Sequence, residues 1–182
     1  IDTGAMYRAL TLKALETSID IKNTPALIEM ARSTNIDLTN EQDGSFKIFL
    51  DSQDVTGLIK QPRITELVSD IAKIKEVREV MLELQRRLGR LRESVLDGRD
   101  IGTVVFPDAD KKFYIDAEFK ERVRRRYKEL KELGQNITLA DIEKDLRNRD
   151  NIDSTREFAP LKKAEDAFYI DTTNMTIEEA VE

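Results

Sequence analysis

The sequence has no cysteine and no histidine. Their absence excludes disulfide bonds, thiolate nucleophiles, zinc sites built from Cys and His, Ser-His-Asp triads and a histidine general base. No apolar run approaches the ~20 residues that cross a membrane, and no secretory signal opens the chain. Any chemistry must therefore use carboxylates, Lys, Arg, Tyr, Ser, Thr or backbone groups, and a reducing cytoplasm is the expected setting.

Charge of one sign is not in large excess. The 182 residues include 30 Lys+Arg and 36 Asp+Glu, for a net charge of -6. This balance argues against a general nucleic-acid coat and against a cationic membrane binder. The hydrophobic content of 40% is enough for a core. The length favours one domain, or one domain with an inserted subdomain.

The 182 residues also lack a P-loop, the motif G-x-x-x-x-G-K-[ST] that cradles the phosphates of a nucleoside triphosphate. None of the seven glycines is followed by lysine. These residues therefore hold no triphosphate cradle of that kind.

Hydrophobic periodicity predicts an α/β fold. Helices are expected over about 5–15, 24–31, 64–74, 76–88, 117–133 and 138–148 and after 176, and strands over 36–38, 46–50, 94–97, 113–116 and 167–171. The expected helix caps are Thr24, Asp116, Thr138 and Thr176. The last three strands are apolar with little alternation, which is typical of parallel strands covered on both faces. An antiparallel hairpin turning at Asp43-Gly44, with the two helices after it, indicates an insertion over 36–91 in this parallel core.

Acidic residues follow the core strands, and the start of the chain, before Asp2, is interpreted as the end of one such strand. These residues are Asp2, Asp97 with Asp100, Asp116 and Asp171. Open α/β sheets bind ligands at the carboxyl ends of their strands, although a strand-end acid is also an ordinary helix cap. Two acids and an arginine within four residues around Gly98 form a costly cluster unless a ligand binds there.

Arginine is the second recurring feature. Arg8 lies one helical turn after the first strand end, Arg99 lies in the acidic turn, and Arg149 and Arg156 flank Asp153 in an expected polar loop. The planar fork of arginine donates two parallel hydrogen bonds to phosphate and keeps its charge. If these arginines converge, they predict a site for a phosphorylated small molecule. The alternative is a set of scattered, solvated arginines.

A basic stretch over 120–132 has three alternative interpretations. Acidic residues interrupt it, and Tyr127 is the one aromatic among its basic residues. It is a solvated helix with i,i+4 ion pairs, an RNA-binding arm, or a mobile lid that grips phosphate.

Several stretches together resemble the bacterial cytidylate kinases, the (d)CMP kinases among the nucleoside monophosphate kinases. The matching stretches are 1–8 (IDTGAMYR), 55–59, 97–107 (DGRDIGTVVFP), 122–127, 149–156, 159–161 and 164–167. The resemblance runs through essentially the whole chain in order, and the stretch over 97–107 is long and specific.

This resemblance implies a P-loop kinase core with a parallel sheet, an inserted subdomain that binds the monophosphate, and a helical lid. The core would occupy 1–35 and 92–182, the insertion 36–91 and the lid about 124–152. The implied reaction is phosphoryl transfer from ATP to CMP or dCMP, giving CDP or dCDP, with Mg²⁺ held through phosphates and water. The expected partners are these nucleotides alone, without stable nucleic acid or membrane contacts, and the expected state is a monomer.

The resemblance also implies roles for individual residues. The residues expected to recognise the cytosine edge are Ser69, Arg78 and Asp100. Those expected to grip the CMP phosphate are Arg8, Arg99 and Arg156, with Thr3 beside that phosphate. The sugar would be held near Tyr7, Arg149 and Asp153. The lid arginines that close over the donor would be Arg122 and Arg126, and the expected catalytic set is Asp2, Arg99 and Arg156.

One part of the family pattern is missing from these residues. In the family, a strand and a P-loop with its helix precede the stretch that matches 1–8. Either a longer protein supplies that segment, or the 182 residues exist alone, in which case we expect weak CMP binding without kinase activity. The alternative functions are a kinase for UMP or AMP and a non-catalytic fragment that binds nucleotide or RNA.

Overall fold

The computed structural model describes residues 1–41, 46–91 and 93–182, so the turn predicted at Asp43-Gly44 lies outside the described residues. The helices are α1 (Thr3–Glu16), α2 (Thr24–Ser33), α3 (Pro62–Ala72), α4 (Lys75–Arg90), α5 (Phe119–Glu132), α6 (Leu139–Thr155) and α7 (Ile177–Val181). The strands are β1 (Ile36–Asn40), β2 (Phe46–Leu50), β3 (Gln53–Asp54), β4 (Phe113–Asp116) and β5 (Phe168–Asp171). A short 3-10 helix covers Leu58–Lys60, and one turn of π-helix, here called the π-turn, covers Ile101–Val105. Of the described helices, none has the length and apolar character needed to cross a membrane.

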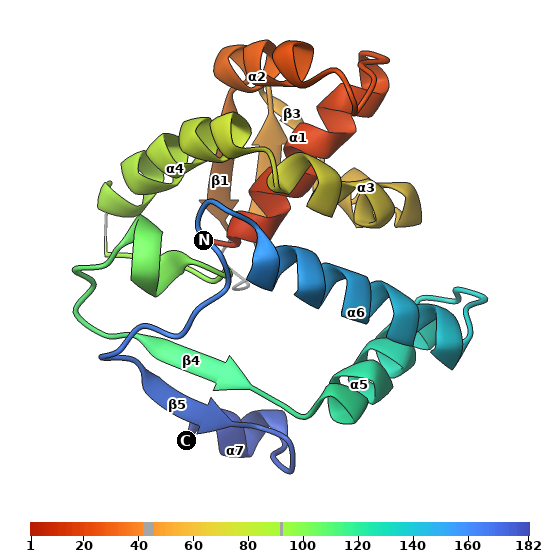
Figure 1. The fold of residues 1–182 in the computed structure, drawn as a ribbon, viewed down its shortest axis with the longest axis vertical. Coiled ribbons are helices and arrows are strands. Elements are labelled where there is room, and N and C mark those ends of the chain that lie inside the picture. The colour runs from red at the N-terminus through yellow and green to blue at the C-terminus, as the bar shows by residue number, and fades with distance from the viewer. Residues whose placement is uncertain (42–45, 92) are drawn as a thin grey trace.

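The described elements confirm the predicted α/β class. Figure 1 shows α1 to α4 with the antiparallel sheet in the upper half of the molecule, and β4, β5 and α7 in the lower half. In the antiparallel sheet β1 pairs with β2, and β2 with β3. In the second sheet β4 pairs with β5 in parallel, with Phe113 opposite Phe168.

Local sequence signals set several helix ends. Asp2 caps α1, because its carboxylate accepts a hydrogen bond from the backbone N–H of Ala5 at 2.8 Å. The capping boxes predicted at Thr138 and Thr176 are both present at the starts of α6 and α7. Two predicted caps are wrong. Asn23 rather than Thr24 caps α2, and the Asp116 carboxylate bonds the next N–H while α5 begins only at Phe119.

Two elements differ more strongly from the prediction. The helix expected to end near 148 continues as α6 to Thr155, so Arg149 and Asp153 lie on a helix and not in a polar loop. Their i,i+4 spacing places them on one helical face, where opposite charges support the helix. The strand expected over 94–97 reduces to a single parallel bridge between Asp2 and Asp97. Its apolar residues have too few described neighbours to form a ladder.

The parallel strands are not covered on both faces, as their apolar sequences predicted. Phe113 is 60% exposed and Ile115 is 69% exposed on β4, and Phe168 is 58% exposed on β5. In the described chain these two strands pair only with each other, so neither is a central strand. An apolar pattern predicts a strand, but its burial depends on neighbouring elements.

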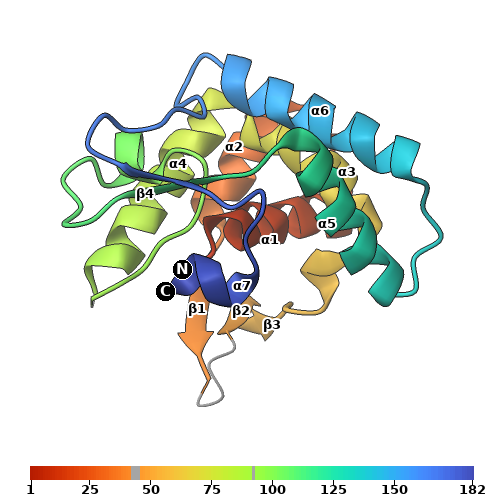
Figure 2. The same ribbon diagram turned by 90° about the horizontal axis from the view of Figure 1, so that it is seen from below.

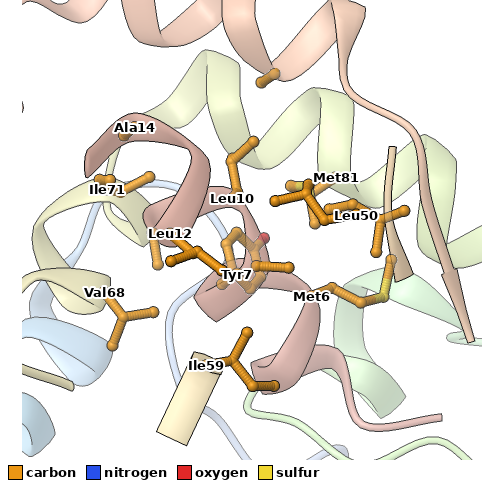
Figure 3. Close-up of a cluster of buried hydrophobic side chains, with 14 of the residues drawn as sticks. Met6, Tyr7, Leu10, Leu12, Ala14, Leu50, Ile59, Val68, Ile71 and Met81 are labelled. Carbon is orange, nitrogen blue, oxygen red and sulfur yellow. The ribbon is translucent and has the colours of Figure 1, made fainter. Parts of the chain in front are cut away.

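The main hydrophobic core surrounds α1, which is buried on nearly all sides. Its members include Met6, Leu10 and Leu12 from α1 and Met81 from α4. Figure 3 shows Tyr7 in the same cluster. Among the described residues this one core also takes in members of α2, α3 and β2 and none after Leu88, so α1 packs mainly with the segment 36–91 and with α2. The proposed domain bounds therefore do not coincide with a gap in packing.

Helices α5 and α6 form a hairpin at one end of the molecule (Figure 2). They share a small separate core of Val123, Leu130 and Ile142. Through its other side α6 contacts α3. This hairpin includes the stretch 124–152 that the sequence indicates as a lid, and both helices extend beyond it.

Candidate active site

The two segments joined by the Asp2–Asp97 bridge, one at the start of α1 and one before the π-turn, lie in close contact. The Thr3 hydroxyl donates a hydrogen bond to the Asp97 carbonyl at 2.6 Å, and the Thr3 N–H bonds the same carbonyl at 3.2 Å. A Cβ atom at Gly98 would come within 2.4 Å of the Thr3 hydroxyl oxygen, so only glycine fits without movement. This contact brings the two acidic turns to one edge.

Two carboxylates lie side by side at this edge. Burial and the neighbouring charge of Asp2 raise the pKa of Asp97. Within the described chain no group of three or more acidic side chains has the arrangement of a metal site. Two carboxylates are fewer ligands than a divalent ion needs, so Asp2 and Asp97 would hold Mg²⁺ only with further ligands from phosphates and water.

A buried ion pair lies below this edge, between α4 and the residue that precedes the π-turn. Nη2 of Arg78 donates to Oδ2 of Asp100 at 2.6 Å, and the two residues are only 3% and 8% exposed. Nη1 of Arg78 also donates to the carbonyl of Ala72 at the end of α3. The pair thus joins α3, α4 and the acidic turn.

Arg156 extends this pair into a larger network. Its Nη1 donates to Asp153 at 3.0 Å, its Nε donates to the Ala159 carbonyl at 2.7 Å, and its Nη2 lies 3.6 Å from Oδ1 of Asp100. The last distance is an ion pair and not a hydrogen bond. Consequently Nη2 of Arg156 and Nε of Arg78 are buried without a hydrogen-bond partner among the described residues. Buried charged donors of this kind are costly, and they are suited to donate hydrogen bonds to a polar ligand.

Tyr7 packs against the same pair from α1. The Arg78 guanidinium carbon lies 5.3 Å from the centre of its ring, within the range of a cation–π contact. Burial raises the pKa of Tyr7 to about 12, so its hydroxyl stays protonated, and the side chain of Gln85 hydrogen-bonds to it. Tyr7 therefore joins the hydrophobic core to the polar network.

Four arginines from distant stretches converge beside this network. Burial and then the charge of Arg99, with Arg8 and Arg126 also contributing, lower the pKa of Arg149 to about 10. Burial and the charge of Arg126 likewise lower the pKa of Arg8. The nearby carboxylate of Asp153 is 3.2 Å from Nε of Arg99 and 3.9 Å from Nε of Arg149. The other carboxylates close to the cluster are Glu129 and Asp2. Together with Asp153 they are fewer than the guanidinium groups, so the cluster favours an anion.

The two predicted lid arginines on α5 differ in their surroundings. Arg126 pairs with Glu129 of its own helix at 2.8 Å, and its charge contributes to the lowered pKa of Arg8 and Arg149. Arg122 pairs with Asp150 of α6 at 2.8 Å and lies over the Phe119 ring. Arg126 is therefore part of the arginine cluster, whereas Arg122 is held within the hairpin.

Most of the predicted site residues lie together. Asp153 contacts both Arg99 and Arg156, and Arg149 is close to both Arg8 and Arg99. Ser69 is less closely joined. It is half-buried on α3, one turn before Ala72, and among the described residues no side-chain hydrogen bond is found for it.

Two residues at this site were missed by the sequence analysis. Thr65 on α3 accepts a hydrogen bond from Nη1 of Arg8 at 2.7 Å. Gln85 is a buried polar residue on the core-facing side of α4 and bonds Tyr7. In the sequence, Gln85 follows Met81 by one helical turn and so lies on the apolar face of the helix. A polar residue at such a position indicates a buried hydrogen-bonding role, which was the available signal.

Taken together, the geometry offers a carboxylate–guanidinium pair with unpartnered donors next to an arginine cluster. The pair suits the edge of a polar heterocycle, which presents donors and acceptors. The cluster suits phosphate, to which arginine donates in a bidentate manner. The site is therefore built for a phosphorylated molecule with a polar ring.

Comparison with known proteins gives a consistent result. A family model described as cytidylate kinase matches residues 1–182. The chain is 50% identical over 182 residues to the cytidylate kinase of Clostridioides difficile, and 49% identical over 182 residues to that of Alkaliphilus oremlandii. Both alignments cover 100% of this chain and 82% of the relative. A cytidylate kinase of Desulforamulus reducens is 48% identical over 181 residues, with 81% of the relative covered.

Proposed function

The chain belongs to the cytidylate kinase family and is thus a nucleoside monophosphate kinase, a transferase; from this premise we propose that its site binds CMP or dCMP as the phosphoryl acceptor. The observation that carries the proposal is the pairing of Arg78 and Asp100 beside the arginine cluster of Arg8, Arg99 and Arg149.

In this proposal, Asp100 accepts a hydrogen bond from the exocyclic amino group of cytosine. Arg78 donates to the ring acceptors, and its buried, unpartnered Nε supports this role. Ser69 contacts the base from α3. UMP carries a carbonyl group where CMP carries the amino group, so the Asp100 side chain, which accepts a hydrogen bond from Arg78, would face a second acceptor and disfavour UMP.

The acceptor phosphate lies among Arg8, Arg99 and Arg156, with Thr3 beside it. Tyr7, Arg149 and Asp153 hold the sugar. The charges of Arg99 and Arg8 act on Arg149 and help to lower its pKa, so these arginines repel one another in the ligand-free chain. Binding of the anion relieves this repulsion. The charge of the site is therefore balanced only in the complex.

The proposed transfer from ATP is in line and needs no covalent intermediate. The acceptor phosphate is already an oxyanion nucleophile, so no strong base is required, which agrees with the absence of histidine and cysteine. Arg99 and Arg156 stabilise charge on the transferring group, and Arg126 and Arg122 of the α5–α6 hairpin close over the donor. Asp2 with Asp97 would hold Mg²⁺ through water, and the bound ion would supply positive charge that offsets the charge of the phosphates.

We further propose that residues 1–182 by themselves bind CMP without transferring phosphate. These residues contain no P-loop motif, so they have no backbone cradle and no P-loop lysine for the donor phosphates. The domain bounds, the monomeric state and the cytoplasmic location remain predictions.

Two measurements test these proposals. Calorimetric titration of the 182-residue chain with CMP, dCMP, UMP and AMP is expected to show tighter binding of the cytidine nucleotides, and equal or tighter binding of UMP or AMP would contradict the base assignment. An ATP-coupled assay is expected to detect no CDP, and robust CDP formation would contradict the second proposal.

RNA binding that persists in the Arg8→Gln, Arg99→Gln double variant and weakens with salt would instead favour an RNA-binding fragment.

A further inference from the structure

The carboxyl half of α4 is joined tightly to the π-turn that follows Asp100. Arg86 of α4 donates from Nε to the carbonyl of Val105 at 2.9 Å and from Nη2 to the carbonyl of Val104 at 2.7 Å. These hydrogen bonds join residues that are distant in sequence, and the Arg86 side chain is partly buried where it makes them.

A second contact, independent of Arg86, lies one turn further along the helix. A Cβ atom at Gly89 would come within 2.7 Å of two ring atoms of Phe106, the residue that ends the π-turn. The helix and the aromatic ring are therefore as close as a glycine permits. Arg78 and Gly89 are about three turns apart on α4 and so share one face, which is the face turned toward the acidic turn and the π-turn.

Asp100 is the residue directly before the π-turn and forms its N-cap. The backbone N–H groups of Val104 and Val105 both donate to the Asp100 carbonyl, at 2.9 and 3.2 Å. Any shift of the Val104 and Val105 carbonyls thus moves the backbone of Asp100. Arg86 therefore bonds the end of a turn whose N-cap residue, Asp100, forms the ion pair with Arg78.

We propose that Arg86 is a positioning residue for nucleotide selectivity: it holds the π-turn against α4 so that the Asp100 carboxylate faces Arg78 and the incoming base. Arg86 does not touch the base in this arrangement and acts only through Asp100. The inference rests on the proposed function, because selectivity for cytosine is assigned to Arg78 and Asp100.

The π conformation gives a physical reason for this role. Single π-helical turns are rare and are frequently found at functional sites. The two forked donors of arginine match two successive carbonyls, which a single ammonium group matches less well. Without Arg86, the turn loses two charge-assisted hydrogen bonds, and Asp100 is held less firmly opposite Arg78.

The test compares the affinities for CMP and UMP in variants of the 182-residue chain. Calorimetry on Arg86→Gln is expected to show that the preference for CMP over UMP falls about tenfold, since CMP loses affinity while UMP binding changes little. Arg86→Lys is expected to keep part of the preference. The matched control is Arg87→Gln, which removes an exposed arginine from the same helix and is expected to leave the preference unchanged.

A second variant covers the case in which Arg86→Gln does not fold. Gly89→Ala favours the helix and keeps every donor of Arg86, but its methyl group displaces Phe106 and with it the end of the π-turn. It is expected to lower the CMP preference as well.

The outcomes separate this inference from the proposed function. If the unmodified chain binds CMP and UMP equally, both fail. If the unmodified chain prefers CMP and the folded Arg86→Gln and Gly89→Ala variants keep that preference within about twofold, only the inference fails. A parallel loss of both nucleotides in Arg86→Gln would also overturn it, because a merely structural role weakens both alike.

Discussion

Replacing Arg149 by glutamine is expected to stabilise the ligand-free chain while weakening CMP binding. Lowering the pKa of Arg149 from its ordinary value to about 10 corresponds to about 3 kcal/mol of unfavourable free energy for its charged form. Its side chain is 35% exposed, and solvent screening reduces this penalty to about 1–2 kcal/mol. The substitution removes that penalty together with one phosphate donor.

The dependence on pH follows from the direction of the shift. The pKa of Arg149 is lower in the folded chain than in the unfolded chain, so the unfolded chain keeps the proton to higher pH. The penalty is therefore fully present at neutral pH, and the free energy of unfolding rises as the pH passes about 10 toward the ordinary pKa of arginine. The Arg149→Gln variant is expected to lack this rise.

The assay is thermal and chemical unfolding without ligand, followed by calorimetric titration with CMP. A gain of 1–2 kcal/mol raises the melting temperature by roughly 2–8 °C for a chain of this size, and the affinity for CMP is expected to fall about tenfold or more. The control is Lys144→Gln, which removes an exposed charge from the same helix and is expected to change stability by less than about 0.5 kcal/mol. Destabilisation of the ligand-free Arg149→Gln chain, or unchanged CMP affinity, would refute the reasoning.

Three other changes are expected to have measurable effects. Asp100→Ala leaves Arg78 buried and unpaired, so denaturant titration is expected to show a loss of about 3–5 kcal/mol, and any folded fraction should bind CMP and UMP equally; retention of the CMP preference would contradict the base assignment. Gly98→Ala forces a Cβ against the Thr3 hydroxyl and is expected to cost about 1–3 kcal/mol in the same assay, whereas Gly134→Ala, which has open space at a left-handed backbone position, tests strain without a clash. Small-angle scattering is expected to show a more compact chain when CMP is added, and identical profiles would count against closure.

The elements set by local chemistry were predictable from the sequence. The capping boxes at Thr138 and Thr176 depend on residues three apart, and the apolar stripe of α4 depends on helical spacing, so both are visible without tertiary information. The π-turn was not predictable, since two of its carbonyls find their hydrogen-bond donor in Arg86, a residue from another part of the chain. The exposure of Phe113 on β4 also depends on which strands lie beside it, and not on its own pattern.

For the site, the residue types were predictable but most of their partners were not. Arginines near strand ends indicate phosphate, whereas the convergence of Arg8 with Arg149 is a tertiary fact. Thr65 and Gln85 were missed because single polar residues on amphipathic helices usually face solvent. Their partners, Arg8 and Tyr7, lie on α1, far from them in sequence.

The shared core around α1 limits which parts of the molecule are able to turn past one another. The backbone that carries Tyr7 and Arg8 is packed into the same core as the helix that carries Arg78, so we expect these three side chains to keep their spacing when a nucleotide binds. The α5–α6 hairpin, which has its own small core, is the part that we expect to move. Release of the product from the kinase would then depend on the movement of these two helices.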